Sequence, residues 1–226
     1  MNLGGIPRLR TCRLCGSPSD SFQAGGMQTP RTYWRCRACG FVFLYHLHIP
    51  DRAAARRRYL LHQNDESSPG YREYMETFAR RCIAAFADPR LPVLDFGSGP
   101  GPKPILPSIL AGLGYECEAY DPLFAPGPSW RKRKYGCLAL HEVAEHFSRP
   151  RRSFAAAARR LGPGGVLAVR TRFIPSEANA FGSWWYKEDP THLSFYNPEA
   201  LETFLHSLGF RAEARPDRDM MVFRLP

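Results

Sequence analysis

Short apolar runs alternate with helical segments over the second half of the chain. The runs are LPVLDFG (91–97), YECEAYD (115–121), YGCLAL (135–140) and GGVLAVRT (164–171), and helices are expected after Gly101 and over residues 150–161. Apolar strands that alternate with helices form mostly parallel sheets covered on both faces. The pattern therefore predicts an α/β domain.

Two helices are predicted before this domain, and a helix with a hairpin is predicted at its end. The segment 51–63 has Asp51 as N-cap, and apolar residues near helical spacing indicate a second helix over roughly residues 70–87. Asn197 is expected to cap a helix over residues 198–208, and the strands FRAEAR and MMVFRL flank a turn at PDRD. We therefore divide the chain into a small β module (1–50), a helical connector (51–90) and the α/β domain (91–226).

The β module contains two copies of one cysteine motif. Each copy is a C-x-x-C-G sequence, and the cysteines are Cys12, Cys15, Cys36 and Cys39. Two thiolates with two residues between them can bind one ion from a tight turn, and the following glycine tolerates the positive φ of that turn. Four thiolates complete a tetrahedron and leave no open position, so the motif predicts a structural zinc ribbon. Cys82, Cys117 and Cys137 are left as expected core thiols.

Composition and charge fit an ordinary globular protein. The chain has 226 residues, of which 44% are hydrophobic and 23% charged, and no apolar run approaches the roughly 18 residues of a membrane helix. The N-terminus lacks the apolar segment of a secretory signal, so we expect a cytoplasmic protein with reduced thiols. Most of the net charge of +10 comes from ten arginines within residues 1–60, which indicates either an anionic partner or a genomic bias toward arginine.

A glycine-rich turn follows the first strand of the α/β domain. The sequence Val93-Leu94-Asp95-Phe96-Gly97-Ser98-Gly99-Pro100-Gly101 has G-x-G-x-G spacing, whereas a dinucleotide site needs G-x-G-x-x-G. The carboxylate of Asp95 would repel a pyrophosphate but suits an ammonium or sulfonium group. Asp121 ends the next strand, where an acid can accept hydrogen bonds from ribose hydroxyls. The alternative is a plain strand–helix turn with a surface aspartate.

Residues 91–171 resemble a class I S-adenosylmethionine-dependent methyltransferase of the kind that carries an N-terminal zinc ribbon. The resemblance rests on VLDFGSGPG, AYDP, ALHEVAEHF and LGPGGVLAVRT. It implies a Rossmann-like seven-stranded sheet whose last strand is antiparallel. It also implies that the methionine portion of the cofactor is held by Asp95, Gly97, Ser98, Gly99 and Gly101, that Asp121 holds the ribose, and that His141 and Glu142 line the cofactor near the sulfonium.

Two features depart from the family pattern. Only the thirteen residues PLFAPGPSWRKRK separate Asp121 from the next strand, where the family places a helix, a third strand and an adenine contact. The helix after the glycine turn contains Pro102, Pro104 and Pro107, so it should start late or bend.

Candidate catalytic residues lie after the fourth-strand position and in a late aromatic segment. Methyl transfer from a sulfonium is an in-line displacement that needs a general base only if the acceptor loses a proton. His146, four residues after Glu142, is expected on the same helical face, either at the mouth of the cofactor site or packing the helix. Asp189 and His192 lie in EDPTHLSFY, which either closes over a substrate or fills a seam with the two side chains hydrogen-bonded to each other.

These observations favour an enzyme that methylates a small molecule. One alternative is an RNA methyltransferase that uses the basic ribbon and the run Arg131, Lys132, Arg133 and Lys134 to contact phosphates. A second is a non-catalytic zinc-ribbon interaction module on a degenerate methyltransferase fold.

Overall fold

The apolar strands of the second half of the chain form one sheet of six strands, in the order β10-β11-β8-β7-β5-β6. The computed structural model describes residues 10–25, 29–61, 69–101, 104–177 and 180–226. The strands are β5 (Val93–Phe96), β6 (Cys117–Tyr120), β7 (Tyr135–His141), β8 (Leu161–Arg170), β10 (Arg211–Asp217) and β11 (Met220–Arg224). Strands β6, β5, β7 and β8 are parallel, and β11 is antiparallel to β8. The predicted C-terminal hairpin and the antiparallel last strand are both confirmed.

The prediction of seven strands is wrong for the part of the chain that is described. Between β6 and β7 the chain forms turns and one short helix, η3 (Ser129–Lys132), so β6 is the last strand at its end of the sheet. The physical reason is length and composition, because thirteen residues with three prolines are too few and too constrained for a helix and a paired strand. Trp130 of η3 is buried instead and packs on Tyr120, with ring centroids 4.8 Å apart.

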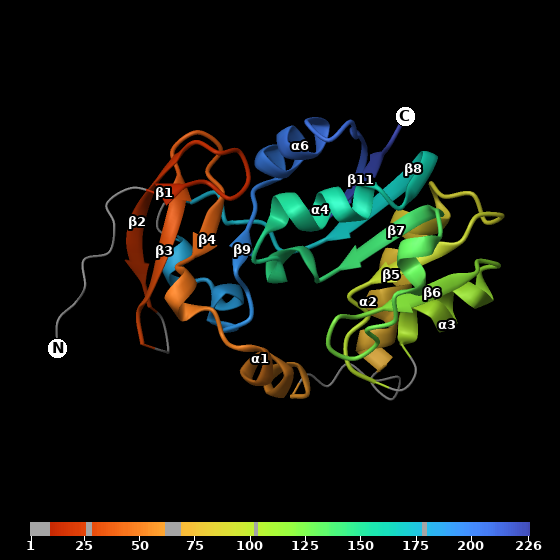
Figure 1. Cartoon of the computed structure of the whole chain (residues 1–226), viewed down its shortest axis with the longest axis horizontal. Coiled ribbons are helices and arrows are strands. Elements are labelled where there is room, and N and C mark those ends of the chain that lie inside the picture. Colours follow the sequence, from red (N-terminus) through yellow and green to blue (C-terminus); the bar gives the residue numbers. More distant parts are fainter. Residues whose placement is uncertain (1–9, 26–28, 62–68, 102–103, 178–179) are drawn as a thin grey trace.

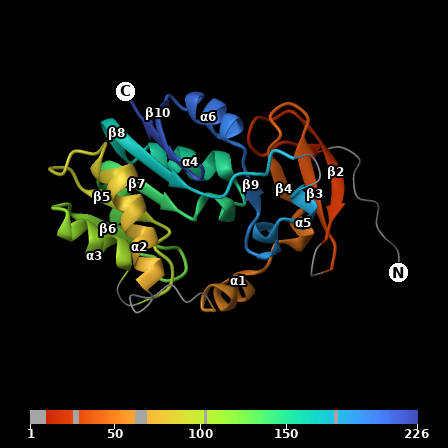
Figure 2. The ribbon, with the colours of Figure 1, turned by 180° about the vertical axis from the view of Figure 1, so that it is seen from behind.

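Helices cover both faces of this sheet (Figures 1 and 2). One face packs against α4 (Pro150–Ala158) and α6 (Pro198–His206), and the other against α2 (Pro69–Phe78), the π-helix η2 (Ala79–Ala84) and α3 (Ile105–Gly112). Helix α3 starts at Ile105 with Pro107 in its first turn, as the prolines predict, whereas Pro102 lies outside the described residues. The side chain of Asn197 accepts a hydrogen bond from Ala200 N, which confirms it as the N-cap of α6.

The N-terminal residues form a second, antiparallel sheet in the order β1-β2-β3-β4-β9 (Figure 1). Its strands are β1 (Arg10–Thr11), β2 (Pro18–Ala24), β3 (Arg31–Cys36), β4 (Val42–Leu44) and β9 (Ser194–Phe195). Strand β9 comes from the late aromatic segment and pairs with β4. The division of the chain at residues 50 and 90 stays a prediction, and the β4–β9 pair shows that this sheet takes strands from both sides of it.

Three short helical segments and one longer helix complete the connections. They are η1 (His46–His48), α1 (Arg52–Tyr59), and the pair α5 (Ala180–Ser183) and η5 (Trp185–Glu188) in the aromatic segment. Asp51 caps α1 by accepting a hydrogen bond from Ala54 N (2.7 Å), as predicted, while residues 62 and 63 of the expected helix lie outside the described ranges. Among the described residues, no helix has the length and hydrophobicity needed to cross a membrane.

Candidate functional site

A cavity of about 1330 Å³ opens where β5, β6 and β7 end. Because these strands are parallel, their carboxyl ends meet at one edge of the sheet, and the loops that follow them form one wall. The cavity is lined by every candidate cofactor-binding and catalytic residue of the sequence analysis: Asp95, Gly97, Ser98, Gly99, Gly101, Asp121, His141, Glu142, His146, Asp189 and His192. The fold therefore brings together residues 95–146 and residues 189–192, which are separated by more than 40 positions in the sequence.

The glycine turn after β5 adopts the conformation for which glycine is needed. Gly97, Gly99 and Gly101 have φ of 92°, 75° and 134°. A Cβ on Gly97 would lie 2.7 Å from Cγ2 of Val143, which is closer than atoms can pack. The turn is thus fixed against the loop that follows β7 and leaves its other side to the cavity.

Replacing Gly97 with alanine is expected to destabilise the domain and to abolish cofactor binding. The new Cβ meets Val143 and is held at positive φ, which together should lower the free energy of unfolding by about 2 to 5 kcal/mol. Thermal unfolding with and without S-adenosylhomocysteine measures both effects. The matched control is Gly112→Ala, because Gly112 has open space around its Cβ position and should leave both quantities nearly unchanged. Equal behaviour of the two variants would contradict the prediction.

Asp121 joins the two loops that face each other across the cavity. Its Oδ2 accepts a hydrogen bond from Gly99 N (3.1 Å), and its Oδ1 accepts from Leu123 N (2.7 Å) and Phe124 N (3.0 Å). The carboxylate is therefore held in one orientation at the end of β6, with the glycine turn beside it.

Asp95 and His141 present buried polar groups to the same cavity. Burial raises the pKa of Asp95 to about 7, with a smaller contribution from the charge of Asp121. Burial lowers the pKa of His141 to about 3, so its ring, which lies between Tyr74 and Phe78, is neutral. His141 Nε2 and Ser98 Oγ have no hydrogen-bond partner among the described residues. A polar ligand with a cationic group would satisfy these atoms and stabilise the ionised form of Asp95.

Glu142 has a strained backbone and two phenolic partners. Its φ is 54°, its Oε1 accepts a hydrogen bond from Tyr74 (2.7 Å), and its Oε2 accepts one from Tyr186 (2.8 Å). Burial raises the pKa of Glu142 to about 7. The prediction that Glu142 and His146 share a helical face is wrong, because Glu142 has a positive φ directly after β7 and lies outside the following helix, η4 (Ala144–His146), which has only three residues. Glu142 instead links α2 to the aromatic segment.

His146 and His192 lie side by side, with ring centroids 4.8 Å apart. His146 Nδ1 donates to the main-chain oxygen of Thr191 (2.8 Å), and His192 Nδ1 donates to that of Tyr186 (2.6 Å). Since a carbonyl can only accept, each Nδ1 carries a proton, and a ring that carries no second proton has its lone pair on Nε2. Asp189 and His192 are joined through the main chain, where His192 N donates to Asp189 O (3.1 Å), and the Asp189 carboxylate pairs with Arg58 (2.8 Å).

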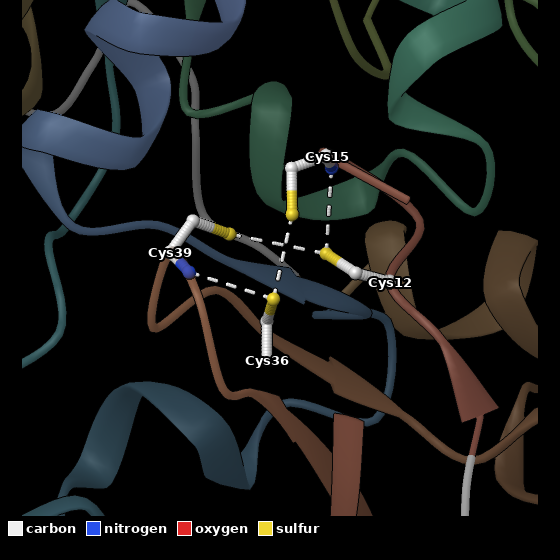
Figure 3. A group of neighbouring side chains, drawn as sticks. All are labelled: Cys12, Cys15, Cys36 and Cys39. Atoms are coloured by element: carbon white, nitrogen blue, oxygen red, sulfur yellow. Dashed lines mark hydrogen bonds between the residues drawn. The ribbon is translucent and has the colours of Figure 1, made fainter. Parts of the chain in front are cut away.

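The four paired cysteines converge on one point (Figure 3). Their sulfur atoms all lie within 4.8 Å of one another, with 3.9 Å between Cys12 and Cys39 and 3.4 Å between Cys15 and Cys36. A tetrahedral zinc ion with bonds of about 2.3 Å would set neighbouring sulfurs about 3.8 Å apart. Positive φ at the two following glycines, 86° at Gly16 and 71° at Gly40, confirms the predicted turns. The donor set and its spacing fit a zinc ion.

The rest of the protein holds both cysteine turns in place. Arg151 of α4 donates to the main-chain oxygen of Leu14 (3.0 Å), and Asn197 donates to that of Cys39 (2.8 Å). Asn197 is also the N-cap of α6 and follows β9 by two residues. The cysteine site is thus connected directly to the segment that carries Asp189 and His192.

Comparison with known proteins identifies the family. Residues 71–214 match a family described as a methyltransferase domain. The chain belongs to this methyltransferase family. Its sheet and cavity accordingly have the class I S-adenosylmethionine-dependent methyltransferase architecture. No curated protein matches the chain significantly.

Solved structures share the fold of this methyltransferase domain at low sequence identity. The 1,6-didemethyltoxoflavin-N1-methyltransferase of Burkholderia thailandensis, solved with 1,6-didemethyltoxoflavin and S-adenosylhomocysteine, is 13% identical, with a TM-score of 0.53 over 90% of this chain and 99% of its own. The N-methyltransferase NodS of Bradyrhizobium japonicum, solved with S-adenosylhomocysteine, is 15% identical, with a TM-score of 0.45 over 76% of this chain and 97% of its own. The first likeness shows that the fold extends over most of the chain.

Several residues that line the methyltransferase cavity are not among the site residues predicted from the sequence. They are Tyr59, Tyr71, Tyr74, Glu145, Arg172 and Tyr186. The motif ALHEVAEHF contains Glu145 next to His146, and this pair was the available signal. The tyrosines of the helical connector carry no such signal in the sequence. Apolar spacing in a helix indicates which residues are buried, but not which cavity a hydroxyl group reaches.

The basic run after β6 is partly used within the methyltransferase fold. Arg133 pairs with Glu116 (2.6 Å), and Lys134 Nζ donates to the main-chain oxygens of Arg159 (3.0 Å) and Leu161 (3.2 Å). These contacts give two of the four basic side chains a role in the fold, and nothing in the described residues favours the RNA alternative.

Proposed function

We propose that this methyltransferase binds S-adenosylmethionine in the cavity and transfers its methyl group to a small-molecule acceptor. The observation that carries the proposal is that one cavity unites the glycine turn, the acidic residue at the end of β6 and the pair of histidines. The cofactor supplies an electrophilic methyl group on a sulfonium. Ionised Asp95 would face the ammonium of its methionine portion, and Asp121 would accept from the ribose hydroxyls.

The size and lining of the cavity support a small acceptor beside the cofactor. Drug-sized ligands occupy cavities of about 300 to 1,000 Å³, so about 1330 Å³ can hold the cofactor and a second molecule. Tyr59, Trp185 and Tyr186 contribute aromatic surface next to the histidines. The Burkholderia enzyme of similar fold binds the small molecule 1,6-didemethyltoxoflavin, which supports the same class of acceptor.

We assign the chemical step to the histidine side of the cavity. Nε2 of His146 or His192 can accept the proton of an acceptor group as its bond to the methyl carbon forms and the bond between sulfur and methyl carbon breaks. The Nδ1 bonds to Thr191 and Tyr186 fix both rings for this role, and the Asp189 carboxylate helps to hold the loop through Thr191 N (2.9 Å).

Calorimetric titration of S-adenosylhomocysteine into the zinc-replete protein tests the cofactor assignment. We expect micromolar binding that Asp121→Asn weakens about tenfold or more, because the amide cannot accept from two hydroxyls while it also holds Gly99. The matched control is Asp20→Asn, since Asp20 is an exposed residue of the N-terminal sheet whose pairing with Arg37 contributes little. A wild-type protein that does not bind S-adenosylhomocysteine would contradict the proposal and favour the non-catalytic module.

We also propose that the four cysteines bind a structural zinc ion. Four thiolates fill a tetrahedral site, so the ion has no position for substrate and serves the fold. The ribbon then supports the acceptor side of the cavity through the β4–β9 pair and the bond from Asn197 to Cys39.

A further inference from the structure

Glu145 places a carboxylate oxygen in the wall of the cavity without a hydrogen-bond partner. The residue is fully buried, and its Oε2 accepts a hydrogen bond from Thr171 Oγ1 (2.8 Å). Its Oε1 has no hydrogen-bond partner among the described residues. A buried carboxylate oxygen left unpaired is costly, so the position calls for a cationic ligand.

The two histidines supply further ligand atoms beside this oxygen. One ligand atom each from Glu145, His146 and His192 lie within 4.8 Å of one another, and His146 Nε2 is 3.9 Å from Glu145 Oε1. Two imidazoles bound to one ion with metal–nitrogen bonds of about 2.1 Å place their ring centroids roughly 4.6 Å apart at an octahedral angle and roughly 5.3 Å apart at a tetrahedral angle. The observed separation is 4.8 Å. Edge-to-face packing alone gives a similar ring distance but leaves Glu145 Oε1 unpaired.

We propose that Glu145, His146 and His192 bind a divalent first-row transition-metal ion at the acceptor end of the cavity. Two imidazoles and one carboxylate suit zinc, iron, cobalt or nickel rather than calcium or magnesium. Both Nδ1 atoms donate to main-chain carbonyls, which is the arrangement that orients metal-binding histidines through their second nitrogen. Three protein ligands leave further coordination positions open, and all three residues line the cavity.

The ion would bind an oxygen of the methyl acceptor. A divalent ion lowers the pKa of a bound hydroxyl group, so the acceptor can react as its conjugate base. With the ion bound, both Nε2 atoms are ligands, and this route replaces the proton transfer to His146 or His192 described above. This role rests on the proposed function, whereas binding of the ion does not. The expected acceptor class is therefore a small molecule that coordinates through a hydroxyl group.

Nickel titration of the full chain loaded with only one zinc ion per chain for the four cysteines, and prepared without a polyhistidine tag, tests the site. We expect calorimetry to show about one Ni²⁺ bound per chain, and X-ray absorption at the nickel edge to show only nitrogen and oxygen neighbours. Affinity should fall at least tenfold in His192→Ala and in Glu145→Gln, which keeps the shape of the buried side chain. His206→Ala is the matched control, because His206 is an exposed residue of α6, and its affinity for nickel should equal that of the wild type.

Titration of S-adenosylhomocysteine into the same preparations separates this inference from the proposed function and shows that each variant is folded. Nickel binding that is absent, that survives both substitutions, or that shows sulfur neighbours would overturn the metal site, even if the cofactor binds. Nickel binding without cofactor binding would uphold the metal site and overturn the proposed function.

Discussion

Replacing Cys36 with serine is expected to release zinc and to unfold the N-terminal sheet, with loss of most of the bound metal. Structural zinc in small modules contributes about 10 to 16 kcal/mol at neutral pH, which is comparable to the whole stability of a domain. Three strands of this sheet, β1, β4 and β9, have only two, three and two residues. Such strands do not persist without the ion that joins their turns.

The loss of structure should extend from the ribbon to the acceptor side of the cavity, whereas the cofactor side should stay folded. Strand β9 pairs with β4, and the Asn197 side chain donates to Cys39 O, so unfolding of the ribbon removes two of the contacts that hold the segment that carries His192. The glycine turn and Asp121 depend on β5 and β6, which lie in the other sheet. We therefore expect the Cys36→Ser variant to bind S-adenosylhomocysteine while residues 10–45 and 184–196 become sensitive to proteases.

Zinc analysis, limited proteolysis and S-adenosylhomocysteine titration measure these three effects. Cys117→Ser is the matched control, because Cys117 lies in β6 outside the metal cluster and should leave the zinc content at that of the wild type. Full zinc content in Cys36→Ser, or zinc loss without any change in proteolysis, would contradict the prediction.

The elements that could be predicted from the sequence are those fixed by local patterns. Strands β5, β7 and β8 are mainly apolar runs, Asp51 and Asn197 are short polar residues ahead of helices, and both glycine motifs specify turns that need positive φ. Each of these signals lies within ten residues of the element that it specifies.

Pairings that are distant in the sequence could not be predicted in this way. The β4–β9 pair joins positions about 150 residues apart, and strand β9 has two residues, too few for a periodic signal. Strand β2 lies in a polar segment, PSDSFQA, in which only Ser19 and Ala24 are buried. The seventh strand was expected from the family resemblance, although the thirteen-residue link already indicated that it had no room.

The candidate site was predictable as a set of residues but not as a geometry. The glycine turn, Asp121 and His146 follow strand ends, and parallel strands bring such positions together. The place of His192 next to His146 depends on the path of the aromatic segment over the ribbon. The positive φ at Glu142, which separates it from the helix of His146, has no sequence signal because glutamate rarely adopts it.

Replacing Asp95 with asparagine is expected to stabilise the protein without cofactor and to weaken cofactor binding about a hundredfold. The folded-state pKa of about 7 lies above the ordinary value of 3.8, because burial disfavours the charged form. A raised carboxyl pKa means that the folded state binds the proton more tightly than the unfolded state. Stability from this group is therefore lost as the pH rises from about 4 to 7.

The difference of about three pKa units corresponds to about 4 kcal/mol above pH 7, part of which an unsatisfied asparagine amide would offset. We expect the melting temperature of Asp95→Asn to exceed that of the wild type by several degrees at pH 8, with the difference shrinking toward pH 5. S-adenosylhomocysteine should bind the variant weakly. The ammonium group of the ligand would no longer face the carboxylate of residue 95, which is the only charged side chain of β5.

Asp219→Asn is the matched comparison, and we expect it to change the melting temperature in the opposite direction. Asp219 is also buried, but its carboxylate pairs with Arg170 (3.2 Å) and Arg172 (3.4 Å), so its neutralisation leaves a buried guanidinium without its partner and should lower the melting temperature. The two substitutions make the same chemical change at buried sites that differ in their charged neighbours. If Asp95→Asn also lowered the melting temperature at pH 8 and left the cofactor affinity intact, Asp95 would be a structural residue, and the cationic group of the cofactor would have to be bound elsewhere in the cavity.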